Sequence, residues 1–180
     1  MIAELYDALG RGEDSVLSEV GMGTFLDPRC GRGSPVQGGR RPQWVEAEDD
    51  RLRYRMPPID VAIFNLPADD RRGNLYADGA EMIGDSREIA RAARRNGGRV
   101  IANVGGRKAG IVAFDAKSGK VLWTATADSA SYSSGIGATI LGRRYAVFLT
   151  RDNLVGLDPA TGQVRFQRAW RARQAASVNA

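Results

Sequence analysis

Apolar residues along the chain follow two successive patterns. In the first, a near-continuous apolar run over 59–66 is typical of a strand buried on both faces of a parallel sheet. A helix is predicted next, beginning at Asp85 or Ser86 and ending at Gly97–Gly98. The strand Arg99–Val104 completes a strand–helix–strand unit, for which a right-handed crossover is expected.

After Gly106 the pattern changes to short strands separated by turns. The segments 110–123 and 153–166 repeat each other at a spacing of 43 residues, and each contains a strand, a D-x-x-[ST]-G turn and a second strand. Two further strands around a turn at Gly142–Arg143 are predicted between them. In each repeat the aspartate can accept hydrogen bonds from turn amides, and glycine supplies the positive φ. These structural turn residues are Asp115, Gly119, Asp158 and Gly162.

The N-terminal segment is less regular. The stretch 18–39 is a glycine-punctuated loop that can bring backbone close to a ligand or another chain, or can be an ordinary surface loop. It lacks a dinucleotide fingerprint, because Leu26 stands where the third glycine belongs. The segment Val45–Met56 predicts a hairpin that turns at 48–50, and its acidic cluster is interpreted as a solvated turn rather than a carboxylate site.

The composition limits the kinds of catalytic and metal-binding site that the chain can form. A chain of 180 residues with 43% apolar and 26% charged residues is globular, with one domain or two small ones. The absence of histidine excludes Ser-His-Asp and Cys-His nucleophile pairs, and a single cysteine leaves no usual zinc site. No P-loop motif occurs. The acidic start is not a secretory signal and no run is long enough for a membrane helix, so a cytoplasmic location without a membrane partner is predicted.

The net charge of +5 is unevenly distributed. Residues 1–105 carry a net charge of −2 and residues 106–180 carry +7. Such asymmetry can indicate a nucleic-acid surface, or two segments with separate histories, and the second interpretation is favoured. The basic stretch 165–173 could contact nucleic acid, but it is interpreted as a strand and the loop that follows it. A nucleic-acid partner is therefore not expected.

The motifs "GMGTFLDPR", "PPIDVAIFNLPADDRRGNLY" and "EIARAARRNGGRVIANV" resemble the α-subunit of family I CoA-transferases over about 18–104. This resemblance implies transfer of coenzyme A between carboxylic acids through a glutamyl-CoA thioester. In that family the nucleophilic glutamate belongs to a β-half with no matching motif here, which implies no catalytic residue in this chain and a need for a complementary subunit. The substrate or CoA-loop candidates are Gly21, Gly23, Thr24, Asp69 and Asn74.

The segment "AFDAKSGKVLW" is similar to the blade signature of the PQQ-like β-propeller repeat family, and the resemblance covers about 106–180. Closing a propeller takes roughly 4–8 blades. Two signatures therefore predict one or two antiparallel blades with open edges, which invite self-association. With so few blades PQQ is not expected as a cofactor, and no metal is expected, whereas coenzyme A is a possible ligand.

Together these features predict a chimera. Its fold class is an α/β part with a parallel strand–helix–strand unit over 1–105, followed by an all-β part over 106–180. The expected function is that of a CoA-transferase-derived protein, inactive alone. The alternative is a non-enzymatic chimeric module, or a propeller scaffold or quinoprotein-like fragment that pairs through exposed strands.

Overall fold

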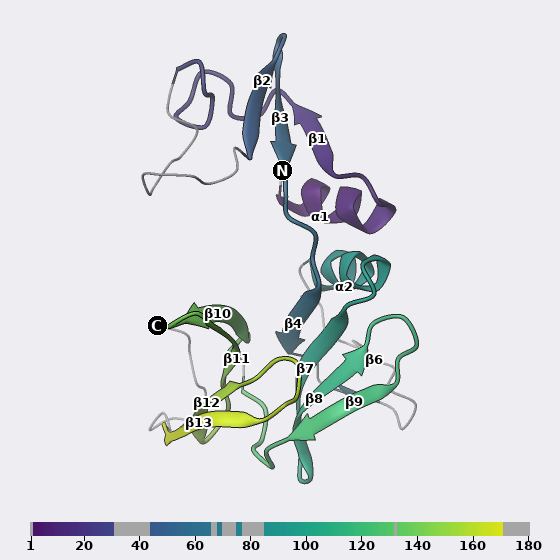
Figure 1. The fold of residues 1–180 in the computed structure, drawn as a ribbon, viewed down its shortest axis with the longest axis vertical. Coiled ribbons are helices and arrows are strands. Elements are labelled where there is room, and N and C mark those ends of the chain that lie inside the picture. The colour runs from purple at the N-terminus through teal and green to yellow at the C-terminus, as the bar shows by residue number, and fades with distance from the viewer. Residues whose placement is uncertain are drawn as a thin grey trace.

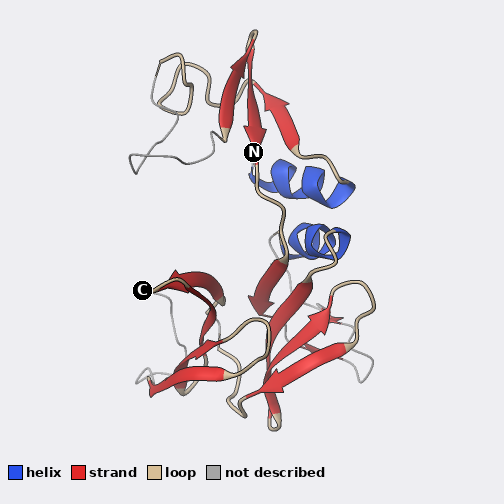
Figure 2. Cartoon of the chain, viewed as in Figure 1, coloured by secondary structure: helices blue, strands red, loops and turns tan. Residues whose placement is uncertain are grey.

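The computed structural model describes residues 2–30, 44–65, 68–69, 75–76, 85–131 and 133–170. These residues form mixed and antiparallel β-sheets with two helices, and the helices lie in the middle of an elongated molecule (Figures 1 and 2). Neither helix of the described part is long and apolar enough to cross a membrane.

A small sheet and the first helix form one end of the molecule. Helix α1 (Ile2–Arg11) and strand β1 (Ser15–Ser18) precede the hairpin of β2 (Val45–Glu48) and β3 (Arg51–Arg55), in the sheet order β1-β3-β2. The hairpin turns where the sequence predicts it, whereas α1 and β1 were not predicted. Their shared core consists of Leu5, Val45, Leu52 and Tyr54.

The carboxylates of the β2–β3 hairpin are paired with arginines. The Glu48 carboxylate accepts two hydrogen bonds from the Arg53 guanidinium, at 2.5 and 2.7 Å, and Glu46 lies 3.5 Å from Arg55 across the strands. The Arg53 guanidinium lowers the pKa of Glu48. Cross-strand ion pairs of this kind stabilise a hairpin and leave its carboxylates engaged.

The second sheet contains both sequence patterns. Its order is β4-β7-β8-β9, formed by β4 (Val61–Asn65), β7 (Arg99–Gly106), β8 (Ala109–Asp115) and β9 (Val121–Ala125). Strand β4 pairs in parallel with β7, and the other two pairs are antiparallel. The change of pattern after residue 105 therefore falls inside the β7–β8 hairpin, within a single sheet. A separate two-stranded sheet joins β5 (Ala68–Asp69) to β6 (Leu75–Tyr76).

The third sheet is an antiparallel meander in the order β10-β11-β12-β13. Its strands are β10 (Ile136–Ile140), β11 (Arg143–Leu149), β12 (Asn153–Leu157) and β13 (Val164–Ala169). Strands β11, β12 and β13 repeat the arrangement of β7, β8 and β9. Strand β4 thus occupies in one sheet the place that β10 occupies in the other, but it runs parallel to its neighbour instead of antiparallel.

The second sheet is covered on both faces. One face packs against the third sheet through a core that includes Ile101, Ile111, Phe148, Val155 and Leu157. The other face packs against helix α2 (Ser86–Arg95) through Ala62, Phe64, Ala93 and Val100. This explains the near-continuous apolar run over 59–66, because successive residues of β4 face opposite layers.

Helix α2 begins and ends where the sequence predicts. Asp85 occupies the N-cap position without a side-chain cap hydrogen bond, and Gly97 ends the helix with φ 64°. At Gly98, a Cβ would lie 2.1 Å from the carbonyl oxygen of Asp60. Glycine therefore allows the start of β7 to approach β4 closely enough for parallel pairing.

Candidate functional site

The glycine-rich loop after β1 is tightly folded at the predicted CoA-loop residues. Gly21 and Gly23 have φ values of 92° and 70°, and the Thr24 hydroxyl donates a 2.7 Å hydrogen bond to the Gly21 carbonyl. The backbone amide of Gly23 donates to the Asp27 carboxylate at 3.0 Å. The three candidates Gly21, Gly23 and Thr24 therefore lie together in one ordered turn.

Asp27 and Arg29 hold this loop closed. Asp27 is 2% exposed, and both of its oxygens accept hydrogen bonds from the Arg29 guanidinium, at 2.9 and 3.0 Å. Arg29 also donates to the carbonyl of Asp49 at 2.8 Å, which ties the loop to the β2–β3 turn. The guanidinium and the two backbone donors at Gly23 and Arg29 hold the pKa of Asp27 well below its usual range.

Tyr54 of β3 contacts the loop through its hydroxyl group. Its hydroxyl donates to the carbonyl of Val20, and burial raises the pKa of that hydroxyl. A Cβ at Gly21 would lie 2.4 Å from the tyrosine oxygen. Gly21 is therefore required both for its backbone conformation and for this close contact.

Large apolar side chains project from this fixed loop into solvent. Phe25 is 69% exposed, Val20 60% and Met22 37%. A rigid turn that presents three exposed apolar residues is a suitable surface for an apolar ligand or partner segment.

The remaining CoA-loop candidates lie elsewhere. The backbone of Asp69 is in β5 and pairs with Leu75 of β6, at the opposite end of the molecule from the loop (Figure 1). Asn74 lies outside the described residues. The described candidates therefore do not converge on one pocket.

The two repeat turns have the same geometry. The Asp115 carboxylate accepts hydrogen bonds from the Ser118 amide and hydroxyl, both at 2.7 Å, and Gly119 has φ 72°. The Asp158 carboxylate accepts from the amide of Ala160 at 2.9 Å, and Gly162 has φ 74°. Hydrogen bonding to Ser118 and to Arg165, respectively, is the main cause that lowers the pKa of these two aspartates. In both turns the carboxylate accepts hydrogen bonds from donors of its own turn, as the sequence predicts for a D-x-x-[ST]-G turn.

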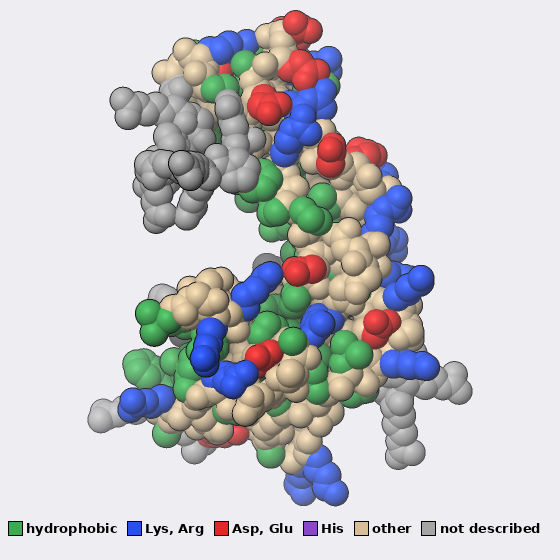
Figure 3. Space-filling model, viewed as in Figure 1, with side chains coloured by type: hydrophobic (Ala, Val, Ile, Leu, Met, Phe, Trp, Pro, Cys, Tyr) green, Lys and Arg blue, Asp and Glu red, His purple; other side chains and the backbone are tan. Residues whose placement is uncertain are grey.

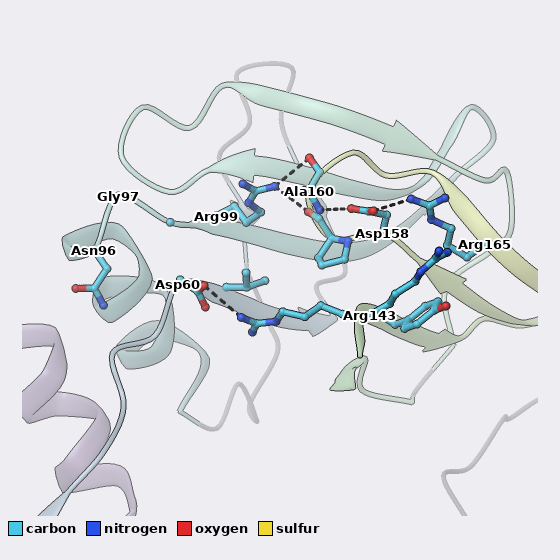
Figure 4. A pocket seen from close by; sticks show the side chains of 13 residues that line it. Asp60, Asn96, Gly97, Arg99, Arg143, Asp158, Ala160 and Arg165 are labelled. Carbon is cyan, nitrogen blue, oxygen red and sulfur yellow. Dashed lines mark hydrogen bonds and ion pairs between the residues drawn. The ribbon is translucent and has the colours of Figure 1, made fainter. Parts of the chain in front are cut away.

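A cavity of about 660 Å³ lies where the helix end and β4 meet the third sheet (Figure 4). Most of its charged groups are paired. The Arg99 guanidinium donates to the carbonyls of Pro159 and Ala160 at 2.9 and 3.0 Å, Arg165 lies 2.9 Å from Asp158, and Arg144 lies 3.5 Å from Asp60. The side chains that line the cavity therefore link the second sheet to the third. Among the lining arginines, only Arg143 lacks a polar partner within the described part.

No group of three or more His, Cys, Asp and Glu side chains in the described part is arranged to hold a metal ion. The free thiol of Cys30 is exposed beside the loop.

Comparison with known proteins places the chain in relation to two families. A family model of the PQQ-like repeat, described as outer membrane protein assembly factor BamB, matches residues 85–180, and because this is more than half of the chain, the protein belongs to that family. Caffeate CoA-transferase of Acetobacterium woodii is 28% identical over an alignment of 114 residues, which covers 58% of this chain and 20% of that protein.

Two crystal structures of the acyl-CoA transferase YdiF from Escherichia coli O157:H7 are also similar. The thioester complex with CoA and the apoenzyme are each 25% identical, with a TM-score of 0.51. They match 57% and 58% of this chain and 21% of their own length. The chain therefore spans about a fifth of its transferase relatives. Both resemblances are confirmed. The matched parts overlap, because the residues matched by the repeat family and by the transferase add up to more than the length of the chain.

Sequence reasoning missed Asp27 and Arg29. Both lie inside the quoted motif "GMGTFLDPR", but no role was assigned to them. The available signal was the spacing: an aspartate two residues before an arginine, just after a glycine turn, can bind both the turn amides and the guanidinium.

Proposed function

We propose that the protein is a CoA-transferase-derived chain that binds coenzyme A or its acyl thioesters and does not catalyse transfer alone. The observation that carries this proposal is the loop Gly21–Arg29. Asp27 and Arg29 fix its backbone, while Val20, Met22 and Phe25 remain exposed. A fixed loop with apolar side chains is suited to the apolar part of an acyl-CoA or to a complementary subunit.

Two further observations support the lineage. Strand β4, helix α2 and strand β7 form a parallel strand–helix–strand unit of the kind expected for the α-half. The transferase relatives are about five times longer than the matched segment, and the resemblance assigns the nucleophilic glutamate to a half that has no motif here. A complementary subunit that supplies this glutamate is therefore part of the proposal, as is a cytoplasmic location.

Calorimetric titration with coenzyme A tests the binding step. We expect saturable binding, and we expect Phe25→Ser or Met22→Ser to weaken it several-fold without unfolding the chain, because both side chains are exposed. Leu141→Ser is the matched control, since Leu141 is 99% exposed on a distant hairpin. The absence of binding by the unaltered chain, or equal weakening by all three variants, contradicts the proposal.

A transfer assay tests the claim of inactivity. With acetyl-CoA as donor and caffeate as acceptor, we expect no turnover by the chain alone. Turnover is expected only after addition of a transferase half that carries the nucleophilic glutamate. Caffeoyl-CoA formation by the isolated chain contradicts this part of the proposal.

A second candidate is a non-enzymatic module that pairs through strand edges. Strands β9 and β10 are sheet edges and expose Val121, Leu122, Ile136 and Ile140, which are 44–58% exposed. Apolar edge strands offer unpaired backbone groups to a second chain. Light scattering after gel filtration is the test: we expect dimers that Ile136→Lys dissociates and Leu141→Lys does not. A monomeric unaltered chain rules this candidate out.

A further inference from the structure

A second cavity, of about 500 Å³, opens to the surface between the ends of helices α1 and α2 and the first repeat turn, and it shares Gly97 with the cavity in Figure 4. Its charged lining consists of Asp7 and Arg11 of α1, of three arginines of α2, and of Lys117 in the first repeat turn. Cations outnumber carboxylates by five to one there, and Arg and Lys side chains gather along this edge of the molecule (Figure 3). This excess of positive charge distinguishes the second cavity from the cavity in Figure 4, whose charged side chains are mostly paired.

Only one of the five cations has a carboxylate partner. Arg11 is bonded to Asp7 and lies 2.8 Å from Glu13. Within the described residues, Arg91, Arg94, Arg95 and Lys117 make no ion pair. Since Arg91 is three and four residues from the other two arginines, like charges face each other on one helix surface, which is unfavourable without an anion.

The helix ends do not remove this excess. Both α1 and α2 end beside the cavity, and each carboxyl end contributes roughly half a negative charge. Together with Asp7 and Glu13, which both pair with Arg11, they offset about three of five positive charges by the same estimate. The remaining positive charge corresponds to that of a multiply charged anion.

The backbone brings these side chains together by close approach. A Cβ at Gly10 would lie 3.4 Å from the Arg91 Cβ, so that glycine allows the two helices to meet. A Cβ at Gly12, where φ is 93°, would lie 2.2 Å from the Arg95 guanidinium. The Arg95 side chain therefore lies over the end of α1, in space that any residue larger than glycine at position 12 would occupy.

We propose that this arginine cavity binds a pyrophosphate group, either as free polyphosphate or as part of a nucleotide. Guanidinium groups match phosphate oxygens in two-point hydrogen bonds, and several are needed to neutralise a diphosphate. A monocarboxylate would leave most of the cations unpaired. Because Lys117 belongs to the repeat segment and the arginines to the N-terminal segment, the ligand would contact both parts of the chain.

Titration of the full chain with inorganic pyrophosphate at low ionic strength, followed by ³¹P NMR and calorimetry, tests the proposal. We expect saturable binding of one pyrophosphate per chain. The double variant Arg94→Gln/Arg95→Gln should weaken it about tenfold or more, which is the size expected for lost charge-assisted bonds. Lys117→Gln, on a different element, should weaken it several-fold. Arg87→Gln is the matched control, since Arg87 lies on α2 outside the cavity.

The outcomes separate the alternatives. Tighter binding of ATP or coenzyme A, displaced by pyrophosphate, identifies a nucleotide as the source of the group, and equal affinities identify free polyphosphate. Coenzyme A binding that survives the double variant while pyrophosphate binding is lost places the two ligands at different sites. The proposal is overturned if pyrophosphate does not saturate, if Arg87→Gln weakens binding equally, or if only oligonucleotides bind and pyrophosphate does not displace them.

Discussion

Asp27 accepts more hydrogen bonds than any other carboxylate of the glycine-rich loop. Its two oxygens accept from the Arg29 guanidinium, from the Gly23 amide and from the Arg29 amide, while its own side chain is buried. The loop conformation therefore depends on one ionised group. Burial without these donors would be unfavourable, because a buried carboxylate needs partners.

Asp27→Asn should lower the melting temperature by several degrees at neutral pH. The folded protein lowers the pKa of Asp27, so its stabilisation is complete above the ordinary value of 3.8 and is lost as the pH falls below it. The difference between the variant and the unaltered protein should therefore shrink in acid. Thermal melts at several pH values check this, with Asp14→Asn as the exposed control. A difference independent of pH would contradict this account.

Asn103 is the residue least suited to its surroundings. It is fully buried, and neither its amide nitrogen nor its oxygen has a partner within the described part. It lies on β7 opposite Ile111, inside the sheet that joins the two segments. A buried amide without hydrogen bonds is destabilising.

Asn103→Leu, which keeps the side-chain shape, should raise the free energy of unfolding by about 1 kcal/mol. Urea denaturation of the variant and the unaltered protein measures the change. Thr150→Val should lower the stability instead, because Thr150 is also fully buried but its hydroxyl donates to the Asp128 carboxylate at 2.8 Å and accepts from the Asn153 amide at 3.0 Å. A loss of stability in Asn103→Leu would show that the amide is satisfied in solution.

At the scale of elements, one indole ring adds to the core between the repeats. Trp123 of β9 lies against the turn of the next repeat, where a Cβ at Gly162 would be 2.5 Å from the ring. The equivalent aromatic residue of the second repeat, Phe166, packs over Gly156 and lies 6.0 Å from Tyr145. Each repeat therefore places an aromatic ring where only glycine leaves room.

Gly162→Ala should be much more destabilising than Gly142→Ala. Both glycines have a positive φ, which costs about 1–2 kcal/mol for alanine. Only Gly162 has a neighbour that must move, which adds about 1–3 kcal/mol of overpacking. Denaturant unfolding of the two variants measures this difference. Equal losses would mean that the Trp123 contact does not hold in solution.

At the scale of the whole molecule, the sheet β4-β7-β8-β9 makes the chain one structure. Strand β4 lies before the residues that the repeat family model matches, whereas β7, β8 and β9 lie within them. Helix α2 covers one face and the third sheet covers the other. The small sheet with α1 is joined mainly through the contact between the two helices.

Shortening the chain tests this arrangement. Residues 57–180 keep both large sheets and α2, so they should unfold in one cooperative transition. Residues 106–180 lose β4 and most of β7, and should show little protection of Ile111 and Ala113 from hydrogen exchange. Circular dichroism melts and exchange mass spectrometry check both. Cooperative unfolding of 106–180 alone would contradict a shared sheet.

The sequence predicted the local elements well. The apolar run before Asn65, the glycines that end α2 and the D-x-x-[ST]-G turns are local signals, and each matches an observed element. Helix α1 was not predicted, since only its Leu5 and Ala8 are buried and such a short stripe is a weak signal. The sharing of a sheet was not predicted, although the two-residue turn between β7 and β8 is a local hairpin signal, because the change of pattern at that turn indicates a boundary between two parts.

The candidate site was predicted in part. The glycines and Thr24 could be found from a motif, whereas Asp27 and Arg29 acquire their role only through a network that reaches the turn at Asp49. The cations of the arginine cavity come from α1, α2 and the first repeat turn, far apart in sequence. Such convergence depends on how the helices pack, which the charge count of each half does not reveal.

The reversed direction of β4 has a consequence for how proteins recombine. A three-stranded meander with one exposed edge accepted a strand of either polarity, since β10 and β4 hold the same place in opposite directions. Foreign sequence can therefore be grafted onto such a meander without matching its orientation, provided that it ends in an apolar strand.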